Sequence, residues 1–351
     1  MDRKYILDLA ASGLRMPIGA DLVLREKPDH EAILIDGRRL GEVVAEAARR
    51  YQTPLAIPLM DLTIEKAQML ASLGVPEADR DTYHLQTCPT EADLGAVDAA
   101  FSKPLIPRLA ANVEAVRHVA ADTDLVPCGM VIGPFSLMVK LVADPISAVY
   151  LAGTGVTADE DPEVRMVETI LEMSTRVILG SATAQMAAGA RLMVIAEPAA
   201  NLVYISPKQL ARGSDIFERL VMQWNRRIVE RIAAHGAQLL FHCCGELTDD
   251  MVRAFASLDP AILSLGSSRK LWEDAALVPK TTVLYGNLPT KRFFSDDITI
   301  EEVLRLADET VTRMKEANHP HILGSECDVL SVPDRHEVIV GKVAAFMQRP
   351  A

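Results

Sequence analysis

The chain has 351 residues, of which 49% are hydrophobic, 24% charged and only 5% aromatic, a composition that excludes a disordered, collagen-like or disulfide-stapled protein. Lys and Arg number 36 and Asp and Glu 48, so the net charge is −12, which argues against a protein that grips nucleic acid or anionic lipid. With five cysteines, no secretory signal and no run of about 20 apolar residues, we expect a reduced, cytoplasmic protein that does not enter a membrane.

From about residue 40 onward, short apolar runs alternate with amphipathic stretches, and no linker divides the chain into domains. In chain order the pattern predicts a helix over 43–52, a strand over 54–60, helices over 63–73 and 109–120, a strand over 125–133, a helix from Pro134, a long helix over 163–189, a strand over 191–197, a helix over 207–235, a strand over 237–243, a helix over 248–258, strands over 261–266 and 281–287, a helix over 299–317, a strand over 321–327 and a helix over 334–347.

Strands that are apolar throughout and separated by helices are typical of a parallel sheet buried on both faces. The number of such units predicts an α/β fold, a (β/α)8 TIM barrel that forms a single domain over residues 1–351. We expect the N-terminal segment, 1–40, to pack on this barrel. A doubly wound open sheet is the alternative, which the pattern alone does not exclude.

Polar or ligand-type residues stand where the apolar runs end. They are Asp61, Gly133, Glu197, His242, Cys244, Asn287, Glu326 and Cys327. In a barrel these positions gather at the C-terminal rim, where the loops that follow the strands build active sites. Their regular placement favours the barrel and predicts a functional site at that rim.

The strongest local signal is FHCCGE, residues 241–246. His242 and Cys244 are two residues apart at the end of a strand, so both can point toward one place, whereas Cys243 should face the other way. Cys327 ends a later apolar strand. Two thiolates and one imidazole suit zinc and leave a fourth position for a substrate. The alternative is that both cysteines are buried apolar residues.

The segment FHCCGELTDDMV resembles the H-x-C-G segment of the zinc-dependent, corrinoid-linked methyltransferases within the uroporphyrinogen decarboxylase superfamily. Other segments resemble the family in the family's own order, from about residue 54 to 335. They are IPLMDLTIEKAQMLASLG (57–74), IGPFSL (132–137), AEPAANLVYISPKQL (196–210), YGNLPT (285–290) and GSECDVLSVP (324–333). The family fold is a TIM barrel, which agrees with the independent strand count.

The resemblance implies that His242, Cys244 and Cys327 hold Zn²⁺ and that the protein moves a methyl group between a small methylated substrate or thiol and a corrinoid. Because the chain carries no cobalamin module, the corrinoid is expected on a partner protein. Two anionic Cys ligands and a neutral His nearly cancel the charge of the metal, so a bound thiolate stays nucleophilic. This ligand set favours thiol alkylation over hydrolysis.

The resemblance also makes Glu197, Asp61 and Asn287 candidate catalytic residues, and Glu65 a further pocket candidate. Glu197 is the first choice for a carboxylate that takes the thiol proton or orients a ligand. For Glu65 a solvated helix face is an equally good interpretation, and for Asn287 a turn role after Gly286.

Two other functions stay open. The first is a decarboxylase of a porphyrin-type acid that needs no metal, although the chain has only Arg15 and Arg25 where that branch has an Arg-rich substrate motif. The second is a non-catalytic zinc or corrinoid binder in which Glu197 or Glu326 closes the metal site as a fourth ligand.

Overall fold

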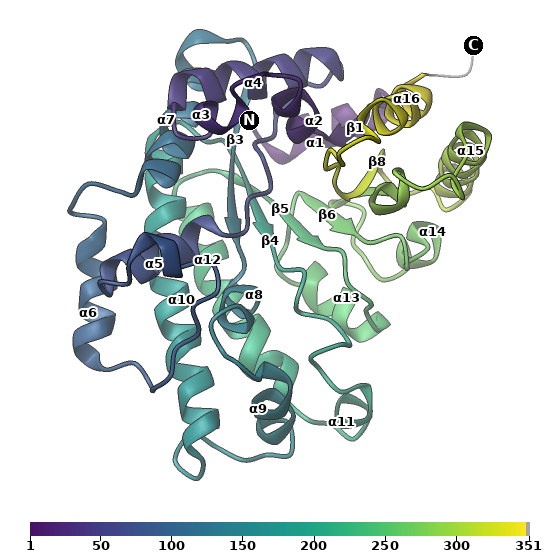
Figure 1. The fold of residues 1–351 in the computed structure, drawn as a ribbon. Coiled ribbons are helices and arrows are strands. Elements are labelled where there is room, and N and C mark those ends of the chain that lie inside the picture. Colours follow the sequence, from purple (N-terminus) through teal and green to yellow (C-terminus); the bar gives the residue numbers. More distant parts are fainter. Residues whose placement is uncertain (349–351) are drawn as a thin grey trace.

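The computed structural model describes residues 1–348, in which eight parallel strands form a curled sheet surrounded by helices (Figure 1). The hydrogen-bonded order of the strands is β1-β8-β7-β6-β5-β4-β3-β2, so β8 returns to the N-terminal strand. The ends of the sheet also meet, because the Thr53 hydroxyl, just before β2, lies 3.3 Å from the Met16 sulfur of β1. This is the strand order of a (β/α)8 barrel, and the predicted TIM-barrel fold is confirmed.

The strands are short, as is usual for a barrel. They are β1 Arg15–Ile18, β2 Leu55–Ala56, β3 Val126–Ile132, β4 Leu192–Ala196, β5 Gln238–Cys243, β6 Ile262–Leu265, β7 Val283–Leu288 and β8 His321–Asp328. The helices are α1 Arg3–Ala11, α2 Ala20–Arg25, α3 His30–Ile33, α4 Gly37–Arg50, α5 Ile64–Ser72, α6 Glu91–Ala100, α7 Pro107–Asp122, α8 Pro134–Val139, α9 Pro145–Ala152, α10 Pro162–Ala187, α11 Pro207–Ala211, α12 Gln223–Ala234, α13 Asp249–Ala256, α14 Leu271–Asp274, α15 Ile300–Glu316 and α16 His336–Met347, with single turns η1 Glu77–Asp79, η2 Glu218–Met222 and η3 Thr290–Arg292.

One cluster of buried side chains draws on all eight strands, which only the inside of a barrel can do. Its strand members are Met16, Ile18, Leu55, Val126, Cys128, Met130, Leu192, Val194, Leu240, Ile262, Val283, Tyr285 and Ile322. Ile6 and Ala10 of α1 join this cluster. The residues that alternate with these, such as Phe241 and Cys243 of β5, belong to a second cluster between the sheet and the outer helices. Position along a strand therefore decides whether a side chain faces the barrel interior or the helices.

The segment 1–40 contributes β1, a strand that the sequence pattern does not predict. Only four residues long, it contains an Arg and a Pro, yet all four residues are buried because β1 pairs with β8. The prediction of one continuous helix over 207–235 is wrong. The chain breaks after α11 at Gly213, which has a φ of +85° that glycine adopts readily, and resumes at the π-turn η2.

Among residues 1–348, no helix combines the length and apolar character that crossing a membrane requires. The longest, α10, is amphipathic and packs along the barrel beside α12 (Figure 1). Both helices bury apolar side chains in the outer cluster, where α10 packs against β3 and α12 against β5.

Candidate metal centre

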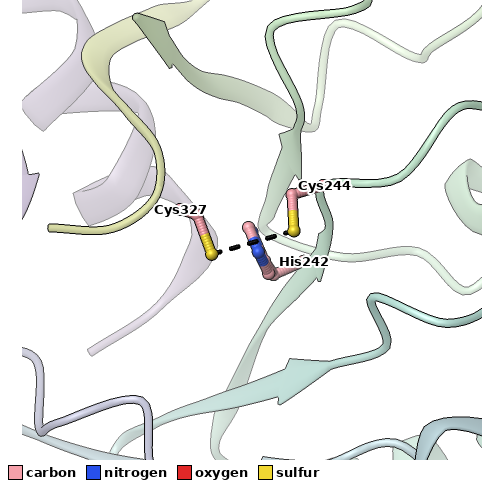
Figure 2. Close-up of side chains that lie close together, drawn as sticks. All are labelled: His242, Cys244 and Cys327. Carbon is pink, nitrogen blue, oxygen red and sulfur yellow. Dashed lines mark hydrogen bonds between the residues drawn. The ribbon is translucent and has the colours of Figure 1, made fainter. Parts of the chain in front are cut away.

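Three of the predicted residues meet at the C-terminal rim of the barrel. His242 lies near the end of β5, Cys244 directly follows that strand, and Cys327 comes from β8. One ligand atom from each lies within 4.8 Å of those of the other two, and the sulfur atoms of Cys244 and Cys327 are 3.7 Å apart (Figure 2). Tetrahedral zinc with bonds of about 2.0–2.3 Å requires ligand atoms roughly 3.5–3.8 Å apart. The sulfur–sulfur separation matches that requirement.

Strand alternation explains how β5 presents its ligands. Leu240 lies in the interior cluster, so His242 faces inward two residues later, while Cys243 is fully buried in the outer cluster. The predicted orientation of Cys243 is confirmed. Beyond the strand end, a Cβ on Gly266 would lie 2.6 Å from the Cys244 carbonyl oxygen. Glycine at this position thus lets the loop after β6 pass directly against the backbone of a ligand residue.

The imidazole of His242 has one satisfied and one unsatisfied nitrogen. Its Nδ1 lies 2.8 Å from the hydroxyl oxygen of Ser264, its partner across the β5–β6 ladder. Its Nε2 is buried and has no hydrogen-bond partner among the described residues. A buried polar atom without a partner is costly, and a metal bond at Nε2 removes that cost. The Ser264 contact meanwhile fixes the ring with Nε2 toward the two thiols, as in many metal-bound histidines.

The two thiols share a perturbed environment. The neighbouring Cys327 thiol holds the pKa of Cys244 well below its ordinary value, and His242 and Lys291 contribute in the same direction. The pKa of Cys327 is raised, because it lies beside Cys244 and is buried. Without a cation, the pair therefore keeps a proton between the two sulfurs. A divalent cation would stabilise both as thiolates, so the three residues fit a soft metal such as zinc.

Two further side chains border the sulfur atoms and were not anticipated from the sequence. The thioether sulfur of Met60 lies 3.8 Å from the Cys327 sulfur, and the Lys291 ammonium lies 3.4 Å from the Cys244 carbonyl oxygen. Met60 ends the apolar run before Asp61, so the same strand-end rule could have found it. Lys291 directly follows the YGNLPT segment.

Glu197 lies on the other face of the sheet. Val194 of β4 faces the interior, so by alternation Glu197 faces the helices, where it is fully buried. Its carboxylate accepts hydrogen bonds from the Ser136 backbone N–H at the start of α8 (2.6 Å) and from the Asn225 side-chain amide (2.9 Å). Burial raises the pKa of this carboxyl. These contacts tie β4 to α8 and α12, and a catalytic role for Glu197 stays a prediction.

Asp61 stands at the rim but is engaged with its neighbours. Its carboxylate accepts hydrogen bonds from the Arg108 guanidinium (2.5 Å) and the Thr63 backbone N–H (3.0 Å). Burial opposes ionisation, yet these donors lower the pKa of Asp61. Glu65 is buried rather than solvated: it accepts a hydrogen bond from Ser181, and burial raises its pKa to about 7. Catalytic function of Asp61 stays a prediction.

Asn287 and Glu326 hold the loops around the cluster. The Asn287 side-chain amide donates to the carbonyl oxygens of Gly266 (2.7 Å) and Arg269 (2.9 Å), which fastens the loop after β6. The carboxylate of Glu326 accepts from the backbone N–H and hydroxyl of Ser267 in that same loop. These contacts keep Gly266 against Cys244. Catalytic participation of Asn287 stays a prediction.

A parallel eight-stranded barrel with one His and two Cys converging at its C-terminal rim defines the class: a (β/α)8-barrel protein with a candidate metal centre. The family model described as Uroporphyrinogen decarboxylase (URO-D) matches residues 21–344, so the chain belongs to that family. The family membership expected from the sequence motifs is thereby confirmed.

Comparison with solved structures adds a distant likeness in fold. A structure described as a methyltransferase from Methanosarcina mazei matches with a TM-score of 0.66 and 15% identity, over 98% of this chain and 98% of that chain. At this identity the likeness shows a shared fold. A comparison with curated proteins found no match.

Proposed function

We propose that this protein is a zinc-dependent methyltransferase that moves a methyl group between a small methylated substrate or thiol and a corrinoid carried by a partner protein. His242, Cys244 and Cys327 would hold the zinc. The observation that carries the proposal is the convergence, on one point of the rim, of two thiols and a buried imidazole nitrogen that has no hydrogen-bond partner within residues 1–348.

Zinc at this position supplies Lewis acidity that lowers the pKa of a coordinated thiol and keeps it ionised at neutral pH. The residues of the chain set the conditions for that chemistry. Ser264 orients His242, and the loop after β6, pinned by Asn287, presses against Cys244. A neutral imidazole and two thiolates balance the charge of the ion, which favours an electron-rich fourth ligand over water activation.

The exposure of the three candidate ligands supports a partner protein that docks at the rim. His242 is buried, whereas Cys244 and Cys327 are only half-buried, so the sulfur side faces outward. A corrinoid is a large cofactor, and a partner protein that docks at the rim would bring it to the sulfur side. The carboxylates suggested as a closing fourth ligand are engaged elsewhere: Glu197 caps α8, and Glu326 binds Ser267. These contacts support a site with an exchangeable position.

The test is methyl transfer from methylcobalamin to 2-mercaptoethanol, followed by the change in corrinoid absorbance. Zinc-loaded wild type should transfer the methyl group, and Cys327→Ala should lose the activity together with the metal. Cys88→Ala is the matched control, because Cys88 is a half-buried free cysteine whose thiol contacts Thr169 of α10 and is not one of the three candidate ligands. Methyl transfer that survives both chelation and Cys327→Ala would overturn the assignment of zinc to this reaction.

A further inference from the structure

A pocket lined mainly by cations lies next to the segment that carries Asp61 to the rim. Its volume is about 350 Å³, and it is bounded by the first turn of α5, the loop over 80–84 and the residue that ends α8. The polar and charged side chains that line it are Thr63, Lys66, Arg80, Asp81, His84 and Lys140. None of them belongs to the candidate metal centre.

Hydrogen bonds between its segments hold the walls of this pocket in place. The Lys66 ammonium on α5 donates to the Asp81 carbonyl oxygen at 2.8 Å. Past the other end of the loop, the Leu85 backbone N–H donates to the Leu141 carbonyl oxygen, just after α8, at 2.9 Å. The loop is therefore fastened to α5 on one side and to the end of α8 on the other, so the pocket is part of the folded structure.

The cations of the pocket are not paired with carboxylates. Lys66 and Arg80 spend hydrogen bonds on backbone carbonyl oxygens, and within residues 1–348 neither they nor Lys140 form an ion pair. Arg108, which lies on the other side of Asp61, does pair with that carboxylate. Only Asp81 brings a negative charge to the lining, which leaves a net charge of +2 when His84 is neutral. The chain as a whole carries −12, so this local excess is unusual.

Burial makes this excess of positive charge costly. Lys66 is only 6% exposed. Burial lowers the pKa of Lys66, and the nearby positive charge of Lys140 lowers it further. The start of α5 adds partial positive charge, because Thr63 at its N-cap accepts no backbone N–H from the first turn. An oxyanion in the pocket would relieve the repulsion and accept hydrogen bonds from these donors.

We infer that this pocket binds the phosphate group of a small molecule. A phosphate monoester carries a charge of about −1.5 to −2 at pH 7, which matches the net charge of the lining. Its oxygens suit the Arg80 guanidinium and the two ammonium groups. Ligand sites commonly measure about 300–1,000 Å³, so the pocket holds a phosphate with a small organic group attached. The inference needs no metal and does not rest on the proposed function.

The test is the binding of inorganic phosphate, followed by the broadening of its phosphorus NMR signal in a titration at neutral pH and constant ionic strength. Wild type should show saturation. Lys140→Gln and Arg80→Gln should each weaken binding about tenfold, which is the low end for the loss of a charge-assisted hydrogen bond. Both residues are half-buried, so their replacement spares the buried Lys66 that helps to hold the loop.

Lys208→Gln is the matched control, because it makes the same change in charge at an exposed position on α11 outside the pocket. It should bind phosphate as wild type does. Acetate distinguishes a phosphate site from a general anion site, and it should displace phosphate at least about tenfold less effectively than sulfate, which keeps the tetrahedral arrangement of oxygens. The inference is overturned if wild type shows no saturation, if Lys140→Gln binds no more weakly than Lys208→Gln, or if acetate displaces phosphate as well as sulfate does.

Discussion

The hydroxyl of Ser264 offers a sensitive test of the centre, because it touches the site only through His242. Its oxygen lies 2.8 Å from His242 Nδ1, and both residues are fully buried. With Nε2 assigned to the metal, Nδ1 carries the hydrogen and donates it to Ser264. Replacing Ser264 by Ala leaves that N–H buried without an acceptor and frees the ring to rotate or change tautomer.

The size of the effect follows from that contact. Loss of a hydrogen bond that orients a metal-bound histidine typically weakens metal binding by about 10- to 100-fold, or roughly 1.4–2.7 kcal/mol. We expect the upper part of this range for Ser264→Ala, because burial prevents water from replacing the hydroxyl. The two thiol ligands remain, so binding should be weakened and not abolished.

Zinc affinity at pH 7 can be measured by competition with a chromophoric chelator. Ser174→Ala is the matched control: Ser174 is equally buried on α10, and its hydroxyl has no partner within the described residues. The control should bind zinc as wild type does. Equal affinity in Ser264→Ala and Ser174→Ala would refute the assignment of Nε2 as a ligand oriented by Ser264.

Two other substitutions test the buried carboxyl groups. Glu197→Ala removes the acceptor for the Ser136 N–H and the Asn225 amide. The free energy of unfolding, measured with urea, should therefore fall by about 3 kcal/mol. A fall of less than about 1 kcal/mol would contradict the capping role. Burial raises the pKa of Glu65 from 4.5 in the unfolded chain to about 7 in the folded protein. Between these two values the folded state keeps a proton that the unfolded state releases. The free energy of unfolding therefore falls as the pH rises from about 4.5 to 7. Glu65→Gln should remove up to about 3 kcal/mol of that decline between pH 5 and 8, and an unchanged slope would show that Glu65 ionises normally.

The sequence predicts most of the barrel because β3 to β8 each contain a largely apolar run, which is a local property. It does not reveal β1, whose burial comes from pairing with β8 more than 300 residues away, and it reads β2 as longer than the two residues that pair with β3. The break at Gly213 is equally invisible, since an isolated glycine is tolerated within a helical pattern. For β1 and β2, what the pattern lacks is information on the distant strand with which each one pairs.

The candidate metal ligands are predictable for the same reason as the strands. His242 and Cys244 end one strand and Cys327 another, and the ends of parallel strands share a rim. The strand-end rule fails to say which face a residue takes: alternation from Val194 would have turned Glu197 toward the helices. Ser264 could not be found, because its position opposite His242 depends on the register between β5 and β6.

X-ray absorption at the zinc edge, combined with metal content, tests most directly whether these three side chains hold one ion. Purified wild type should carry one zinc per chain, with two sulfur atoms at about 2.3 Å and one imidazole nitrogen at about 2.0–2.1 Å. Cys327→Ala should lose most of the metal and one sulfur from any that remains. A zinc shell without sulfur, or an unchanged zinc content in Cys327→Ala, would contradict the assignment of the metal centre.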